Sequence, residues 1–170
     1  LQKLFAPENV CITGSFKRQL EIVDELEYVI NGSIENIKPK FETANPPELL
    51  EENTDSLLYK LHNGLKLRLY SATDTFEKKC FFTAGSSEFV SDFIFRFPDI
   101  EFSGCSVSDD SAVFNQAGIN YIPFCLRETP EIIERAKAAP LPQLIQPSDI
   151  KGIIHSHSNW SDGSNTLEEM

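Results

Sequence analysis

The sequence predicts an α+β fold, in which a small mixed sheet with helices on one side precedes a second, largely helical lobe. Three observations support this prediction. The chain has 170 residues, 41% of them hydrophobic, which is enough to bury a sizeable globular core. Short β-like runs and one hairpin signal occupy the part that ends at Tyr70. Helical stretches punctuated by prolines follow it.

Two β-like runs come first along the chain. "NVCIT" at residues 9–13 is a short run with β-branched residues that predicts a strand. "ELEYVI" at residues 25–30 predicts a second strand, stopped by the Asn-Gly pair that follows it. Its alternation places Glu25 and Glu27 on one face of the sheet.

The next two elements are a helix and a hairpin. "NPPELLEEN" at residues 45–53 opens with prolines, which favour a helix start, and we expect a short helix there. "SLLYKLHNGLKLRLY" at residues 56–70 has two alternating runs around Asn63-Gly64, the preferred pair for a tight turn. This stretch predicts a β-hairpin.

Helical patterns dominate the rest of the chain. We expect helices over residues 75–82, 86–95 and 110–117, and another over residues 130–138 that is capped by Thr129. The last of these lies in a proline-punctuated stretch, which predicts a connector between two lobes.

Charge and cysteine content narrow the classes of function. The net charge of −11 and the lack of a basic stretch argue against tight, sequence-independent DNA binding, because such binding needs Lys and Arg at the phosphates. The four cysteines are widely spaced and include no C-x-x-C pair, so we expect buried thiols of a cytoplasmic protein. No apolar run approaches the length of about 18 residues that spans a bilayer, so we expect no membrane partner. The start, in which leucines have helical spacing, suggests a piece of a longer protein.

"GIIHSHSNWSDGSNTLEEM" closes the sequence with a metal-site pattern. His155 and His157 are two residues apart at a predicted strand end, and Asp162 supplies a carboxylate from a following loop. Asn165 is a predicted helix N-cap, with Glu168 in the capping-box position.

The stretch "DIKGIIHSHSNWSDG" resembles the first motif of PHP domains, the polymerase and histidinol phosphatase superfamily. The resemblance implies a distorted barrel that holds metal ions and attacks phosphoesters. It makes His155, His157 and Asp162 ligands for Zn or Mn. The other ligands of such a site come from later strands, so we expect an incomplete site here and the remainder of the barrel as a partner.

The sequence before it resembles bacterial X-family DNA polymerases, in which a nucleotidyltransferase palm and thumb lead into a PHP domain. "ITGSFKR" matches the Gly-Ser loop of that family, and "YIPFCLRETPEIIERAKAAPLPQLIQPSDIKG" matches the thumb end and the barrel entry. The resemblance implies a palm at residues 1–97, a thumb-like lobe at 98–139, a connector at 140–151 and the truncated first strand of a PHP barrel at 152–170. It also implies DNA and deoxynucleotide triphosphates as partners, and a nucleotide-binding set of Gly14, Ser15, Arg18, Gly85 and Ser86.

The sequence departs from that family at its catalytic carboxylates, which would hold two Mg or Mn ions. Glu25 and Glu27 stand where the family has Asp-x-Asp, and Arg68 stands at the third carboxylate position. A guanidinium repels metal ions and has the charge to pair with both glutamates. Our hypothesis is that an Arg68–Glu25/Glu27 cluster has replaced the metal site, leaving a degenerate palm that scaffolds the phosphoesterase of a DNA-repair protein.

Alternatives remain open on the sequence. Glu25 and Glu27 fit equally well the solvated face of an ordinary strand. A polymerase that still works with Mn²⁺, or an acidic module that binds a protein partner, is also compatible with the pattern.

Overall fold

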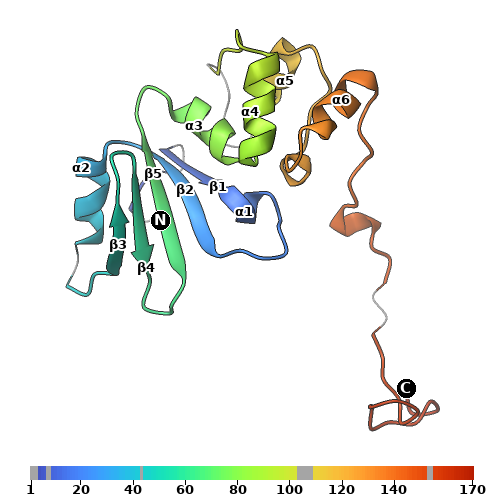
Figure 1. Cartoon of the computed structure of the whole chain (residues 1–170). Coiled ribbons are helices and arrows are strands. Elements are labelled where there is room, and N and C mark those ends of the chain that lie inside the picture. The colour runs from blue at the N-terminus through green and yellow to red at the C-terminus, as the bar shows by residue number, and fades with distance from the viewer. Residues whose placement is uncertain (1–3, 7–8, 43, 103–108, 153–154) are drawn as a thin grey trace.

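The computed structural model of the chain describes residues 4–6, 9–42, 44–102, 109–152 and 155–170. A five-stranded sheet forms one side of the molecule, a group of helices lies beside one end of it, and the C-terminal segment leaves both (Figure 1). The predicted α+β class is confirmed at this level.

The sheet is mixed, with strand order β1-β2-β5-β4-β3. Strands β2 and β5 are parallel neighbours, and the other pairs are antiparallel. The two strands predicted at residues 9–13 and 25–30 are confirmed as β1 and β2. The strand bounds are β1 Val10–Thr13, β2 Glu25–Asn31, β3 Glu48–Glu52, β4 Ser56–Lys60 and β5 Lys66–Ala72.

Each face of the sheet has its own apolar cluster, because alternate side chains of a strand point to opposite faces. One cluster combines Ile30, Leu57, Leu67 and Leu69 with side chains from α2 (Ile34–Ile37) and the 3₁₀ helix Lys38–Phe41 that continues it. The other cluster combines Cys11, Val29 and Ala72 with Phe76 and Cys80 of α3 (Phe76–Thr83). Glu25, Glu27 and Arg68 lie on the α3 side, in register with this second cluster.

The hairpin predicted at residues 56–70 is confirmed, with a longer turn than expected. Leu61 N–H donates to the Leu65 carbonyl at 2.8 Å, so the loop between the paired ends has three residues. Gly64 takes φ +87°, the left-handed conformation that closes such a loop. The turn glycine was identified correctly, and the two-residue turn was wrong.

The helix predicted over residues 45–53 is wrong, because the structure has strand β3 there. The strand pairs with the edge of β4, where Leu49 is opposite Tyr59 and Glu52 is opposite Leu57. A helix this short has little stability of its own. The unpaired edge of β4 supplies hydrogen-bond partners instead.

The helices predicted after the hairpin are confirmed within a residue or two. They are α3, α4 (Ser87–Arg96), α5 (Ser111–Gln116) and α6 (Glu131–Ala138). The predicted Thr129 cap of α6 is wrong, because Pro130 occupies the N-cap position.

A phenylalanine-rich core holds these helices together. Phe81, Phe89 and Phe93 pack with Val113 and Ile133 in one cluster. This core spans the boundary that the sequence placed between residues 97 and 98. Arg127 lies inside the lobe with no exposed side-chain surface and binds Asp110 at 2.6 and 2.9 Å.

Of the four cysteines, Cys11 and Cys80 are buried as predicted. Cys125 is partly exposed, which departs from the expectation. Cys105 lies outside the described residues.

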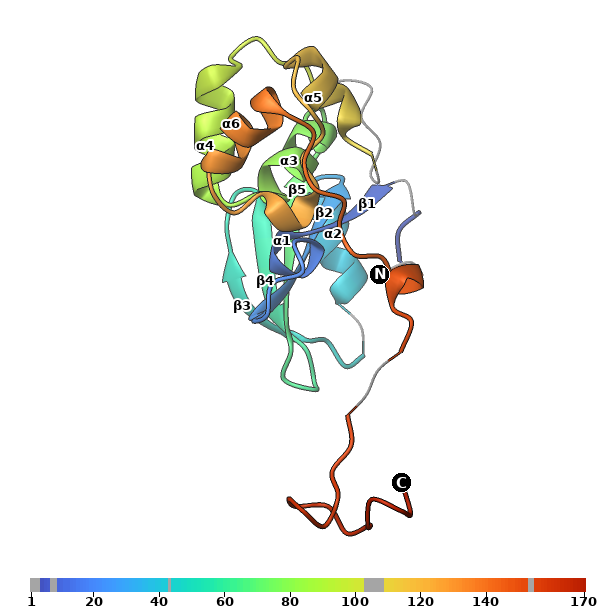
Figure 2. The same cartoon turned by 90° about the vertical axis from the view of Figure 1, so that its right-hand side faces the viewer.

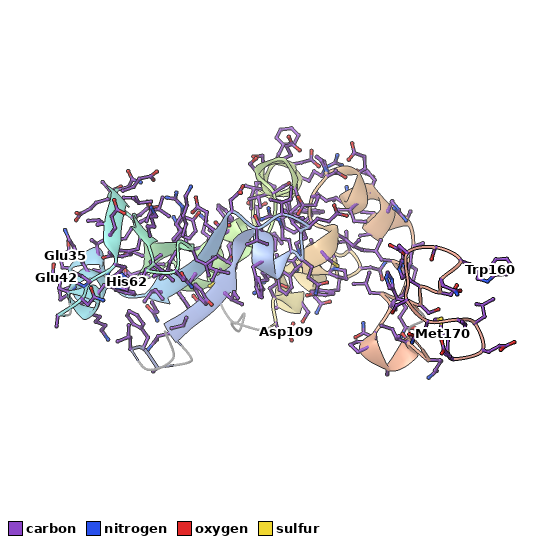
Figure 3. The ribbon with its side chains drawn as sticks, turned by 90° about the horizontal axis from the view of Figure 1, so that it is seen from below. Glu35, Glu42, His62, Asp109, Trp160 and Met170 are labelled. Atoms are coloured by element: carbon purple, nitrogen blue, oxygen red, sulfur yellow. The ribbon has the colours of Figure 1, made fainter. Side chains whose placement is uncertain are left out.

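The C-terminal segment runs away from the sheet and the helices after α6 (Figures 1 and 2). Residues 155–157 have no regular secondary structure, and the residues that follow form turns joined by one bridge between Ser158 and Asn165, so the helix start predicted at Asn165 is wrong for this structure. The strand predicted before His155 includes residues 153 and 154, which lie outside the described residues. Thr166 N–H donates to Glu169 at 2.8 Å, one residue later than the predicted capping pair. Trp160 is 85% exposed and projects outward (Figure 3).

Within the described residues, no helix has both the length and the apolar character to cross a membrane.

Candidate functional site

The predicted catalytic residues meet on the α3 side of the sheet, where β2 and β5 run in parallel. Glu27 is opposite Arg68 and Glu25 is opposite Lys66 in the strand register. The sequence alternation brings both glutamates to the face of Arg68, as predicted. The three predicted positions therefore lie together at one end of the sheet.

Arg68 binds Glu25 through two nitrogens. Its Nε lies 2.6 Å from Glu25 Oε2 and its Nη2 lies 3.2 Å from Glu25 Oε1. Its Nη1 donates to Glu51 of β3 at 3.2 Å. The hydrogen bonds that Arg68 donates to Glu25, and to a smaller extent to Glu51, raise the pKa of Arg68 above its already high value, although burial opposes this shift. The guanidinium is therefore a permanent cation between two carboxylates.

Glu27 does not bind Arg68, which corrects the predicted three-residue cluster. Its Oε1 accepts the Ser15 N–H at 3.2 Å, and its Oε2 accepts the Tyr70 hydroxyl at 2.9 Å. A side-chain carbon at Gly14 would overlap the Glu27 carboxylate. Gly14 also has φ +65°, which favours glycine. The Glu27 carboxylate thus lies directly against the Gly-Ser turn.

Tyr70 keeps its proton in this site. Burial raises the pKa of its hydroxyl, and the negative charge of Glu27 raises it further. Both effects favour the neutral phenol, which donates its hydrogen to Glu27. Tyr70 therefore holds one oxygen of the Glu27 carboxylate, while the Ser15 N–H holds the other.

The remaining predicted nucleotide-binding residues meet at the start of α4. Ser86 caps that helix by accepting the Phe89 N–H at 3.0 Å, and its hydroxyl donates to the Glu128 carbonyl at 2.7 Å. A side-chain carbon at Gly85 would lie 2.7 Å from the Phe89 ring. Gly85 and Ser86 are thus accounted for by the packing and capping of α4.

Arg18 joins the Gly-Ser turn to this helix start. Its Nε lies 2.5 Å from Glu128 Oε1, and its Nη1 donates to the Gly85 carbonyl at 3.4 Å. Only 13% of the Arg18 side chain is exposed. The structure brings Gly14, Ser15, Arg18, Gly85 and Ser86 into one region. There the Ser15 N–H donates to Glu27 and Arg18 pairs with Glu128, so carboxylates of the chain already occupy these donors.

Three partners in this region were missed by sequence reasoning. Tyr70 is two residues beyond Arg68 on β5, so strand alternation alone could have placed it on the same face. Glu51 could not be found, because its segment was expected to be helical. Glu128 lies far from Arg18 in the sequence, and no local pattern links them.

The predicted PHP-type ligands also lie together. Asp162 hydrogen-bonds His157 Nδ1, and His157 Nε2 lies 2.9 Å from His155 Nε2. Because an ionised carboxylate only accepts, Nδ1 of His157 carries the hydrogen of this contact. Asp162 thus orients the ring of His157 in this structure. In the described part of the chain, no group of three or more His, Cys, Asp or Glu side chains is placed to hold a metal ion.

Three surface hollows lie away from these residues. Their volumes are about 430, 380 and 190 Å³, and they are found at residues 97–100, at residues 140–144 and beneath residues 4–6. The predicted site residues line none of these three hollows.

The chain matches no protein-family model and no curated protein in the comparisons made with it.

Proposed function

We propose that the sheet and its helices are a degenerate nucleotidyltransferase-like palm of the X-family polymerase kind, in which an ion pair stands in place of the catalytic metals. In this proposal the palm scaffolds a PHP-type phosphoesterase that begins near residue 152. The observation that carries it is the pairing of Arg68 with Glu25 through Nε and Nη2, at 2.6 and 3.2 Å.

The donor set does not fit a pair of Mg²⁺ ions. Nucleotidyl transfer needs carboxylates that hold two metals, which stabilise the attacking oxygen and the leaving pyrophosphate. Both Glu25 oxygens accept hydrogen bonds from Arg68. Arg68 itself stands where the family has its third carboxylate, so that position carries a positive charge. A metal would have to displace a two-point charge-assisted pair, and it would then sit next to a guanidinium. We therefore assign no nucleotidyl transfer to this site.

The groups that would bind a triphosphate are also occupied by acidic side chains of the chain itself. The Ser15 N–H holds the Glu27 carboxylate, and Arg18 is bound by Glu128. A bound phosphate would meet the negative charge of Glu27 at the turn. Loss of nucleotide binding thus accompanies loss of the metal site in this proposal.

At the C-terminal end, we assign His155 and His157 to the first motif of a PHP-type metal centre. Two imidazoles suit Zn or Mn, which would polarise a phosphoester for attack by water. The Asp162 contact with Nδ1 of His157 directs Nε2 of that ring toward His155. In this arrangement Asp162 supports the histidine rather than binding the ion.

Calorimetric titration with a deoxynucleotide triphosphate at constant Mg²⁺ tests the palm proposal. We expect no binding by the native chain and metal-dependent binding by Arg68→Asp, which restores a carboxylate at the third position. Lys60→Asp is the control, because it makes the same charge change on the exposed part of neighbouring β4. Binding by the control variant would assign the effect to charge alone.

A second titration in Mn²⁺ separates the proposal from the rival polymerase. Micromolar, metal-dependent binding by the native chain would overturn the degenerate-palm assignment and favour a Mn²⁺-dependent enzyme. Primer extension on native chain and Arg68→Asp would then decide whether activity already exists.

A further inference from the structure

Two cysteines that the proposed function does not use face one another beneath the sheet. Cys11 lies on β1 and Cys80 on α3, and both belong to the cluster that fills the α3 side of the sheet. Cys11 has no exposed surface and Cys80 is 8% exposed. Their sequence positions are far apart, so only the docking of α3 on β1 brings them together.

A second pair fixes how α3 docks on β1. Thr13 Oγ1 lies 2.7 Å from Thr83 Oγ1. Thr13 is two residues from Cys11 on the strand, and Thr83 is three residues from Cys80 on the helix, so each cysteine shares the face of its threonine. The Cys80 thiol hydrogen-bonds the Cys11 sulfur, so the next pair along this contact is a pair of sulfurs.

Charge around the pair distinguishes the two sulfurs. Lys17 Nζ lies 3.6 Å from Cys11 Sγ. The hydrogen bond from Cys80, and then the charge of Lys17, lower the pKa of Cys11 to about 7, although burial and Asp110 oppose this shift. The same hydrogen bond and burial raise the pKa of Cys80. Cys11 is therefore the sulfur of the pair that forms a thiolate more readily, and Cys80 is the thiol that donates to it.

We propose that Cys11 and Cys80 form a redox-sensitive pair that hydrogen peroxide converts into a disulfide between β1 and α3. The Cys11 thiolate attacks one peroxide oxygen, the O–O bond breaks, and hydroxide leaves. The resulting Cys11 sulfenic acid is attacked by the Cys80 sulfur, which forms the S–S bond and releases water with the Cys80 proton. The two thiols lose two electrons and two protons, and the peroxide becomes two waters.

Such a bond would fix α3 to β1 directly before Gly85 and Ser86. It would constrain the unfolded chain between two distant positions, which raises resistance to unfolding. Thiol exchange with glutathione would reverse it, as is usual for transient disulfides in reducing compartments. The inference does not depend on the proposed palm or phosphoesterase.

Peptide mapping of the peroxide-treated chain under non-reducing conditions tests the proposal. Trypsin places Cys11 in the peptide of residues 4–17 and Cys80 in that of residues 80–96, whereas Cys105 and Cys125 share the peptide of residues 97–127. We expect the intact mass to fall by two hydrogen atoms, with peptides 4–17 and 80–96 linked. A link that includes peptide 97–127, or stepwise gain of oxygen on Cys11 without a link, would overturn the proposal.

Matched variants separate the pair from a general effect of oxidation. Cys125→Ser should form the link as the native chain does, whereas Cys80→Ser should trap Cys11 as a sulfenic acid that a dimedone probe labels. Lys17→Met should slow the link at pH 7 by about three- to tenfold, because fewer Cys11 thiolates are present. Lys40→Met is its control, because both lysines lie over an aromatic ring: Lys17 is 4.1 Å from the Phe124 centroid and Lys40 is 4.4 Å from the Phe5 centroid. Equal rates for the two lysine variants would contradict the assigned role of Lys17.

Discussion

Arg68 of β5 and Glu25 of β2 form a two-point ion pair across parallel strands, with Nε 2.6 Å from Oε2 and Nη2 3.2 Å from Oε1. The side chains are only 17% and 24% exposed, so solvent screens this pair less than an exposed one. The pair also neutralises one of two adjacent glutamates on the same strand face. It is the contact on which both the stability of this end of the sheet and the proposed loss of metal chemistry depend.

The first prediction concerns the strength of that pair. Arg68→Met keeps the aliphatic stem but leaves Glu25 without its cation, and we expect a loss of about 1–2 kcal/mol in the free energy of unfolding. The double-mutant cycle with Glu25→Gln should give a coupling energy of about 1 kcal/mol. Urea denaturation of the four proteins measures both. Additive single effects would mean that the contact contributes no net stability.

A second prediction concerns the pH dependence at Tyr70. Its pKa is raised by burial and then by Glu27, so the folded state holds the proton more tightly than the unfolded chain. This contribution to stability is complete below pH about 10, the pKa of an unfolded tyrosine, and is lost as the pH rises through the folded pKa. Glu27→Gln should lower the Tyr70 pKa while leaving it above the ordinary value, because burial remains.

Ultraviolet titration of the tyrosinate band measures this change, and Tyr70→Phe identifies which transition belongs to Tyr70. An unchanged Tyr70 transition in Glu27→Gln would contradict the hydrogen bond assigned between these two side chains.

A third prediction tests the contact between Gly14 and Glu27. Alanine in the left-handed conformation costs about 1–2 kcal/mol of folding free energy. Gly14→Ala should cost more than this, because the new carbon also overlaps the Glu27 carboxylate. Gly118→Ala is the matched control, because Gly118 has φ +68° with open space around it. In the Glu27→Ala background most of the excess cost at Gly14 should disappear, because only the Cβ of residue 27, at 2.9 Å, still crowds the new carbon. Thermal unfolding followed by circular dichroism gives the comparison.

The fourth prediction concerns the buried pair in the helical lobe. Arg127 is completely buried, binds Asp110 at 2.6 Å, and lies 4.2 Å from the Phe124 ring centroid. Asp110→Ala leaves that cation buried without its partner and should cost about 3–5 kcal/mol. Adding Arg127→Met to Asp110→Ala removes both buried charges and should restore part of the lost stability. The exposed Glu134→Ala should cost less than about 1 kcal/mol in the same urea series.

The sequence by itself determined the elements whose signals are local. The alternation in residues 25–30 predicted β2, and the Asn63-Gly64 pair between two alternating runs predicted the hairpin. The helical pattern over residues 86–95, ended by Pro98, predicted α4. Each of these signals depends on residues a few positions apart, where backbone conformation and side-chain direction are coupled.

Only the tertiary structure decided the partners of the charged residues. Alternation placed Glu25 and Glu27 on one face and the family resemblance put Arg68 beside them, but neither could show that Arg68 binds Glu25 and Glu51 while Glu27 lies against the Gly-Ser turn. Strand β3 itself depends on the open edge of β4, which does not exist until the hairpin has formed. The physical reason is that ion pairs and strand edges are satisfied by whichever group is nearest in space, and that distance is set by the packing of the whole sheet.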